Sequence, residues 1–256
     1  MQSGALSFLP LAEVPEVEPG ADLAGLLRQA LTATGEALAD GDVVVVAQKI
    51  VSKSENRYVE LASVEPRPEA LDLARLCGKD PRVVELVLRE SSEVLRVAPN
   101  VLIVRHRLGF VVANAAIDQS NLPGGAGRAL LLPTDPDASA AGLRQALAQA
   151  AGANVAVLIS DSFGRPWRLG VTGVCVGCAG LDALADARGT ADRNGRPLQV
   201  TQIAVADQLC AAATLVGGEA AEGTPLVLVR GVSRNYLSVS RPASVLLRPR
   251  EQDLFR

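Results

Sequence analysis

The run Val43–Val46 constrains the fold more than any other feature of the sequence. It consists only of β-branched residues, and the turn residues Gly41-Asp42 precede it. A strand with apolar side chains at every position buries both of its faces, so we expect a sheet that is covered on each side. The apolar run Val155–Ile159 predicts a second strand of this kind.

Helices are predicted where apolar residues recur every three or four positions. Residues 22–38 form one such segment, capped by Asp22, and residues 68–90 form two short helices that are separated at Gly78. The remaining predicted elements are helices at 139–151 and 205–216, and strands at 5–9, 101–104, 110–113, 171–178, 198–205 and 225–229. Several neighbouring strands lack a crossover helix, which predicts an α+β fold of mixed β-sheets with flanking helices. The polar tail, residues 241–256, is predicted to end freely.

The composition favours a folded enzyme that acts on a small molecule. Of the 256 residues, 48% are hydrophobic and 21% are charged, which excludes disorder. The length fits a single domain over residues 1–256, or two intertwined subdomains. A net charge of −3 and only 3% aromatic residues give no indication of nucleic-acid binding. No apolar run predicts a membrane segment, and four uneven cysteines without a leader predict a cytoplasmic protein.

Asp118 lies in the segment NAAIDQSN (residues 114–121), just after a predicted strand. Small residues let the backbone approach a ligand closely, and a carboxylate there can hold a hard divalent cation through oxygen. An Asx turn that closes the strand explains the same residues equally well.

The segment SDSFGRPWR (residues 160–168) follows the predicted strand 155–159 directly. Sheets of this kind bind ligands at the carboxyl ends of their strands. An aspartate beside a hydroxyl, here Asp161 and Ser162, commonly holds Mg²⁺ against nucleotide phosphates. Arg165 and Arg168 could clamp a phosphate or a carboxylate. The weaker alternative is a solvated turn with Trp167 buried in the core.

Lysine is rare: of 25 basic residues only Lys49, Lys53 and Lys79 are lysines. The first two lie in QKIVSK, at the end of the strand that contains Val43–Val46. A lysine ammonium is a compact charge that suits a phosphate oxygen, although two solvated surface lysines would look the same.

Gly217-Gly218-Glu219 closes the predicted helix 205–216. Two glycines allow backbone N–H groups to turn toward an anion, and Glu219 is a candidate third carboxylate for a metal. A simple helix stop is the commoner meaning of such a pair.

Three other patterns are given structural interpretations. Cys175 and Cys178 have the spacing of metal or redox ligands, but they form one pair inside a predicted strand, so we expect two buried thiols. The glycines at 124–127 lack the Lys-Ser/Thr ending of a phosphate-binding loop. His106, between two arginines, is predicted to lie on the surface.

Taken together, GDVVVVAQKIVSKSE, NAAIDQSN, LLLPTDPDASA, ISDSFGRPWRLGVTGV, GRPL and VADQLCAAATLVGGE resemble the coenzyme F420-0:L-glutamate ligase family over about residues 5–232. That family extends the glutamate tail of a deazaflavin cofactor with GTP and divalent metal. The resemblance implies its α+β fold of mixed sheets and a homodimer with the site near the subunit contact. Some members carry a further flavin-binding domain, which is not expected here.

The resemblance also implies roles for individual residues. Asp118, Asp161, Ser162 and Glu219 would bind two divalent cations, Mg²⁺ or Mn²⁺, and K⁺ is a further candidate ion. The GTP site would be formed by Val14, Pro15, Glu16, Val17, Gln48, Lys49, Lys53, Asn121 and the stretch 217–224, with Gly217, Gly218, Glu219 and Thr224. Lys53 would neutralise charge in catalysis, and Arg165 and Arg168 would hold the acidic substrates, coenzyme F420-0 and L-glutamate.

The implied reaction is the formation of an amide from a carboxylate through an acyl phosphate, with one glutamate or several added. For phosphoryl transfer a protein mainly has to position the reacting groups and neutralise the charge of the phosphates, and metals, lysines and arginines can do this. Two other classes remain open: a metal-dependent nucleotide phosphohydrolase or kinase, and a protein that binds a nucleotide or deazaflavin without turnover.

Overall fold

The computed structural model describes residues 5–253 except 121 and 124. Its helices and strands are β1 (Ser7–Leu11), α1 (Leu23–Ala33), β2 (Val43–Ala47), α2 (Gln48–Ser54), β3 (Tyr58–Glu60), α3 (Pro68–Cys77), α4 (Pro81–Arg89), β4 (Ser91–Ala98), β5 (Val101–His106), β6 (Val111–Ala113), β7 (Arg128–Leu130), α5 (Pro136–Ala151), β8 (Ala156–Arg165), β9 (Arg168–Ala179), β10 (Ala185–Asp186), β11 (Gln202–Ile203), α6 (Val205–Gly217), β12 (Leu226–Arg230) and α7 (Arg234–Leu237). The α+β class predicted from the sequence is confirmed.

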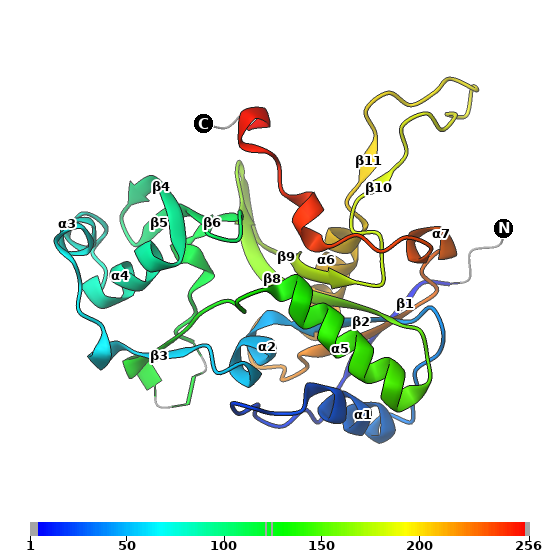
Figure 1. Cartoon of the computed structure of the whole chain (residues 1–256), viewed down its shortest axis with the longest axis horizontal. Coiled ribbons are helices and arrows are strands. Elements are labelled where there is room, and N and C mark those ends of the chain that lie inside the picture. Colours follow the sequence, from blue (N-terminus) through cyan, green and yellow to red (C-terminus); the bar gives the residue numbers. More distant parts are fainter. Residues whose placement is uncertain (1–4, 121, 124, 254–256) are drawn as a thin grey trace.

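The largest sheet has five strands in the order β1-β12-β2-β8-β9. Strands β2 and β8 pair in parallel, whereas every other neighbouring pair of this sheet is antiparallel. The predicted mixed sheet is therefore present, with the run Val43–Val46 beside the apolar first part of β8. The long connection between β2 and β8 contains a separate group of elements, which lies at the left in Figure 1.

Both faces of this sheet are covered, as the run Val43–Val46 predicts. Val44 and Val46 pack toward α1 and α5, and Val43 and Val45 pack toward α6 on the opposite face. All four valines are buried. Alternation along a strand thus gives each face its own apolar core, and the helices lie on the two sides of the sheet in Figure 1.

The register of the sheet brings four chain segments to one edge. Ala47, the last residue of β2, pairs with Ser160 in β8, and Val46 pairs with Leu226 at the start of β12. Leu11, the last residue of β1, also pairs with Leu226. The residues that follow β1, those that follow β2, the middle of β8 and the loop before β12 therefore meet at this edge.

We call the described residues of 57–130 the small lobe and those of 5–54 and 136–253 the large lobe. The small lobe contains the antiparallel sheet β4-β5-β6, the pair β3-β7 and helices α3 and α4. The predicted break between its helices is confirmed: Gly78 adopts a left-handed conformation (φ 69°), and the Asp80 carboxylate accepts the Arg82 N–H (2.9 Å). The sequence analysis missed strand β4.

Three predicted boundaries are wrong. Helix α1 ends at Ala33 rather than at residue 38. Strand β8 does not stop at Ile159 but continues to Arg165, because β9 pairs with it along this whole length. The predicted strand 198–205 is only Gln202–Ile203 (β11), and α6 begins at Val205. The two lysines of QKIVSK lie at the end of β2, as predicted, on helix α2.

His106 is buried, so its predicted place on the surface is wrong. Its Nδ1 atom accepts the Leu108 N–H (3.0 Å), and its Nε2 atom lies 3.5 Å from a carboxylate oxygen of Glu90. Arg107 also donates to Glu90 (3.0 Å). The imidazole is therefore buried at the end of β5, although the neighbouring Arg107 is exposed.

The tail does not end freely within the described residues. The Asp137 carboxylate accepts the backbone N–H groups of Ala243 and Ser244 (2.7 and 3.3 Å), which fixes the start of the tail to the large lobe. Arg250 donates to Glu93 of the small lobe (3.0 Å). The tail therefore runs from one lobe to the other, which agrees with its path in Figure 1. No helix among the described residues is long and apolar enough to span a bilayer.

We expect Leu158→Ala to lower the free energy of unfolding by about 2–5 kcal/mol, because Leu158 is fully buried between β2 and α6 and its loss leaves a cavity. Urea unfolding followed by circular dichroism measures the difference. Leu215→Ala on α6 is the control, because that side chain is exposed and its truncation should change stability by less than about 0.5 kcal/mol. Equal effects of the two variants would contradict the assignment of the core.

Candidate functional site

A cavity of about 630 Å³ lies where the sheet edge meets the small lobe. This volume is typical of a site for a small-molecule ligand. The residues that the sequence analysis assigned to metal or nucleotide and that line it are Val14, Pro15, Glu16, Val17, Gln48, Lys49, Lys53, Asp118, Asp161, Ser162, Gly217, Gly218, Glu219 and Thr224. The remaining residue of that set, Asn121, is outside the described residues.

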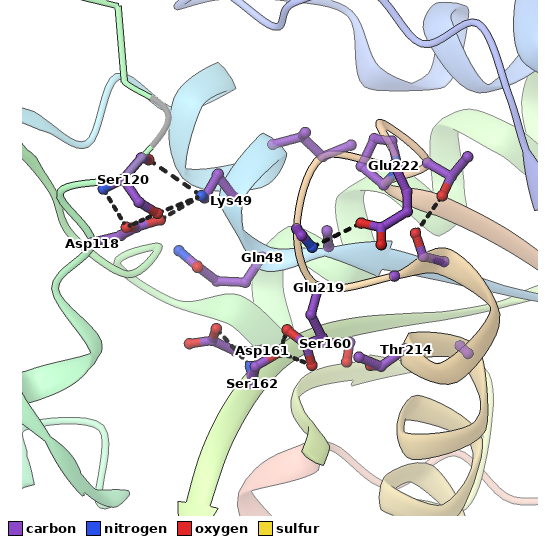
Figure 2. A pocket seen from close by; sticks show the side chains of 18 of the residues that line it. Gln48, Lys49, Asp118, Ser120, Ser160, Asp161, Ser162, Thr214, Glu219 and Glu222 are labelled. Carbon is purple, nitrogen blue, oxygen red and sulfur yellow. Dashed lines mark hydrogen bonds and ion pairs between the residues drawn. The ribbon is translucent and has the colours of Figure 1, made fainter. Parts of the chain in front are cut away.

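Asp118 enters the cavity from the small lobe and meets a lysine of the large lobe. Its backbone exchanges hydrogen bonds with Leu130, and its carboxylate accepts both the N–H and the hydroxyl of Ser120 (2.7 Å each). The Lys49 ammonium lies 2.7 Å from the other carboxylate oxygen. The Asx-turn interpretation is thus confirmed by the Ser120 N–H bond, and it holds together with a position in the cavity wall (Figure 2).

The charges around Asp118 keep it ionised. Burial alone raises the pKa of the Asp118 carboxyl, but hydrogen bonds from Lys49 and Ser120 outweigh burial and hold its pKa below the usual range. The second lysine, Lys53, is buried and pairs with Glu16 of the segment after β1. The two lysines, one helical turn apart on α2, thus contact acidic groups on two different sides of the cavity.

Asp161 lies in the part of β8 that the register places beside Gln48. Burial and the negative charges of Asp118 and Glu219 raise the pKa of Asp161 from 3.8 to about 7, against a hydrogen bond from the Ser162 N–H (2.8 Å) and the positive charge of Lys49. The Gln48 side chain extends between Asp118 and Asp161 in Figure 2. The three carboxylates therefore influence one another electrostatically.

Ser162 and Glu219 contact each other across the cavity. The Ser162 hydroxyl lies 2.8 and 2.7 Å from the two Glu219 carboxylate oxygens and donates to them. Glu219 follows the end of α6, where Gly217 is the last helical residue and Gly218 has a positive φ of 86°. The helix-stop interpretation of the glycine pair is confirmed, and the same stop brings Glu219 to β8.

The donor chemistry of these residues fits a hard divalent cation, since carboxylate and hydroxyl oxygens are the ligands that Mg²⁺ and Mn²⁺ prefer. No group of three acidic, histidine or cysteine side chains among the described residues already converges as a metal site. Mg²⁺ is commonly bound through one or two carboxylates together with substrate phosphates, so separate carboxylates suit an ion that arrives with a nucleotide.

The predicted substrate arginines do not line the cavity. Arg165 and Arg168 pair across the tip of the β8-β9 hairpin. Trp167, between them, is 89% exposed, which excludes the alternative of a core side chain. Their binding role stays a prediction. The hairpin reaches the cavity with residues 160–164 and with Val171, which pairs with Gly164 next to the tip.

Comparison with known proteins agrees with these motifs. Residues 12–231 match the model of the family described as F420-0:Gamma-glutamyl ligase. The chain is 47% identical to a Coenzyme F420:L-glutamate ligase of Methanothermobacter thermautotrophicus, over 98% of this chain and 99% of the relative. It is 43% identical to one of Methanopyrus kandleri, over 99% and 100%, and 44% identical to one of Natronomonas pharaonis, over 98% and 95%.

The chain belongs to the F420-0:gamma-glutamyl ligase family. It is therefore an amide-bond-forming ligase, as the sequence analysis predicts. In this ligase the cavity described above brings together predicted site residues that are spread over more than 200 residues of sequence, from Val14 to Thr224.

Sequence reasoning assigned no role to several polar residues of the ligase cavity. Ser120 supports Asp118. Glu222 was included only as part of the stretch 217–224, and in the structure it accepts the Ala220 N–H (2.7 Å) in the loop before β12. Ser160 is buried, lines the cavity, and has no hydrogen-bond partner for its hydroxyl in the described part of the chain. In the sequence, Ser160 comes directly before Asp161 in the same segment, which could have indicated a place in the site. Side chains alternate along a strand, however, so neighbouring residues are expected to face opposite sides of the sheet, and this expectation argued against Ser160.

The cysteine pair serves the core of the ligase and not the cavity. Cys175, Cys178 and Cys210 are free and buried between β9 and α6, as predicted for the first two. Burial and the neighbouring thiols raise the pKa of Cys175 well above its usual value, which keeps this thiol protonated and unreactive. Asp207 accepts the Cys175 N–H (2.9 Å) and so ties α6 to β9.

We expect Asp161→Asn to stabilise the metal-free ligase above pH 7 by about 1–3 kcal/mol, part of what a three-unit pKa shift allows. Because the folded-state pKa of Asp161 is raised to about 7, the folded protein keeps a proton that the unfolded chain loses above pH 4. The ionisation of Asp161 therefore costs stability progressively as pH rises from about 4 to 7. Asparagine avoids this cost.

The measurement is urea unfolding in EDTA from pH 4 to pH 8. The difference between wild type and Asp161→Asn should be near zero at pH 4, grow toward pH 7 and then level off. A difference that is independent of pH would show that Asp161 ionises normally in the folded protein.

Proposed function

We propose that this ligase joins L-glutamate to the deazaflavin precursor coenzyme F420-0, using GTP and divalent cations, in the biosynthesis of coenzyme F420. The observation that carries the proposal is the convergence of the segments after β1 and β2, the middle of β8 and the loop before β12 on one cavity with Asp118. The relatives are named as ligases of coenzyme F420 and L-glutamate, which supports the identity of the acceptor and the amino acid.

The charges of the cavity support a nucleotide that arrives with metal. Its lining contains two lysines, Lys49 and Lys53, but five acidic residues: Glu16, Asp118, Asp161, Glu219 and Glu222. A triphosphate would be repelled by this surplus of negative charge unless cations accompany it. Asp118, Asp161, Ser162 and Glu219 would hold two divalent cations. Bound there, the metals would neutralise charge on the transferred phosphoryl group.

In the proposed reaction an oxygen of the F420-0 carboxylate attacks the γ-phosphorus of GTP. The bond between that phosphorus and the bridging β–γ oxygen breaks, which gives an acyl phosphate and GDP. The amine of L-glutamate then attacks the acyl carbon, inorganic phosphate leaves, and the amine loses a proton. Lys53, buried beside the nucleotide segment after β1, supplies positive charge for the phosphates.

Incubation with GTP, Mn²⁺, L-glutamate and F420-0 tests the proposal, with product mass and phosphate release as readouts. We expect the mass of F420-0 to increase by one glutamate residue or several, with one phosphate released for each addition. Phosphate release that does not need glutamate or F420-0 would favour a nucleotide phosphohydrolase. Thermal stabilisation by the ligands without any turnover would favour a binding protein.

Lys53→Ala should reduce GTP-dependent turnover by at least about 100-fold, because it removes the buried positive charge proposed to face the phosphates. Lys79→Ala is the matched control, since Lys79 lies in the small lobe, at the turn between α3 and α4, and does not line this cavity. Initial rates at varied GTP concentration measure both. Equal rates for the two variants would remove Lys53 from the nucleotide site.

We also propose a homodimer in which the second copy covers the β8-β9 hairpin. Leu169 is fully exposed and Val171 is 55% exposed, close to Trp167, so the hairpin presents three large apolar side chains to solvent. Such a cluster is typical of a surface that another protein covers. Gly164 and Val171, next to the tip of the same hairpin, line the cavity, which supports a subunit contact near the site.

The double substitution Trp167→Glu/Leu169→Glu should convert the dimer to a monomer in sedimentation-velocity experiments. Leu76→Glu, at an exposed position of α3, is the control and should leave the mass unchanged. A wild-type protein that sediments as a monomer at micromolar concentration would refute the dimer.

A further inference from the structure

Lys49 is the one lysine of the cavity lining that bonds to a candidate metal carboxylate among the described residues. Its ammonium lies 2.7 Å from Asp118 and 3.3 Å from both the backbone oxygen and the hydroxyl oxygen of Ser120. Lys53, the other lysine of the cavity, pairs with Glu16 instead. In Figure 2, Lys49, Asp118 and Ser120 form a connected group.

The hydrogen bonds of this group occupy both oxygens of the Asp118 carboxylate. One oxygen accepts the N–H and hydroxyl of Ser120, and the other faces the Lys49 ammonium. A divalent cation binds the same lone pairs. Cation binding to Asp118 therefore requires Lys49 to move away, because two positive charges cannot share one carboxylate oxygen without strong repulsion.

The surroundings give Lys49 a second partner when it moves. It stays on α2 at the edge of the same cavity, where the proposed nucleotide would bring several negative charges. A cation that arrives alone breaks the Lys49–Asp118 pair, and the nearby carboxylates to which Lys49 could turn, Asp161 and Glu219, are candidate ligands of the same cations. A cation that arrives with a triphosphate exchanges the Lys49–Asp118 pair for a metal–carboxylate contact and a lysine–phosphate contact.

We propose that Lys49 is a built-in counter-ion of Asp118, which weakens the binding of a divalent cation alone and thereby couples metal binding to nucleotide binding. The coupling is reciprocal: the nucleotide tightens metal binding by the same factor by which the metal tightens nucleotide binding. The identity of the nucleotide rests on the proposed function, whereas the competition for Asp118 rests on the contacts of Lys49.

Mn²⁺ binding to the nucleotide-free protein tests the competition, with free Mn²⁺ measured by electron paramagnetic resonance. Lys49→Met keeps most of the side-chain volume and removes the charge. It should tighten Mn²⁺ binding by about three- to fivefold, in the range expected for a partly exposed ion pair. Lys49→Arg keeps the charge and should leave the affinity within about twofold of wild type.

Lys53→Met is the matched control, because it removes an equal charge from the same cavity but from a lysine paired with Glu16. It should change the Mn²⁺ affinity clearly less than Lys49→Met. Equal tightening in both would show a general effect of charge and overturn the proposal, as would an unchanged Mn²⁺ affinity in Lys49→Met. Thermal unfolding verifies that each variant is folded.

The same measurement with a non-hydrolysable GTP analogue tests the coupling. In the wild type the analogue should tighten Mn²⁺ binding at least tenfold, and in Lys49→Met this factor should fall severalfold. Failure of the ligase reaction with these Mn²⁺ results intact would refute the proposed substrates alone. Normal product formation with no effect of Lys49→Met on Mn²⁺ would refute the counter-ion alone.

Discussion

The parallel pairing of β2 with β8 is the constraint on which the rest of the structure depends. Both strands are apolar on each face, so they pair only where helices cover both sides, and the separate cores under α1/α5 and α6 satisfy this need. The pairing of Ala47 with Ser160 then determines which residues lie side by side just beyond this point of the two strands. Gln48 and Lys49 begin α2 beside Asp161, without any further interaction being required to bring them together.

The large lobe alone leaves the site without Asp118. That carboxylate comes from the small lobe, whose sequence lies between the two parallel strands and which is attached to the large lobe by apolar packing and by the tail. Phe110 packs edge-on against Phe163 of β8 (ring centroids 5.9 Å apart), and the tail joins Arg250 to Glu93. Apolar packing and tail contacts therefore hold the lobes together, whereas the cavity wall is where their charges meet.

The parts of this architecture that depend on short stretches of sequence could be predicted. The valine run, the helix break at Gly78 and the three carboxylates that follow strands or helices are local patterns, and the motifs placed them in one site before any contact was known. The buried His106 and the docked tail could not be found in this way. Each depends on a charge far away in sequence, Glu90 for His106 and Glu93 for Arg250, so a locally polar stretch gave the wrong environment.

The length of β8 is another feature that local sequence patterns could not predict. Residues 160–165 contain serine, aspartate, glycine and arginine, which are poor strand formers, yet they remain extended because β9 offers a partner at each step from Asp161–Val174 to Gly164–Val171. Tertiary pairing thus overrides local preference where polar groups must be held rigidly. This rigidity has an electrostatic cost: Asp161 is held near two other carboxylates, and burial together with their charges raises its pKa to about 7. The apolar cores on both faces of β2 and β8 offset that cost, so the strand pairing that builds the site also stabilises the unfavourable charges within it.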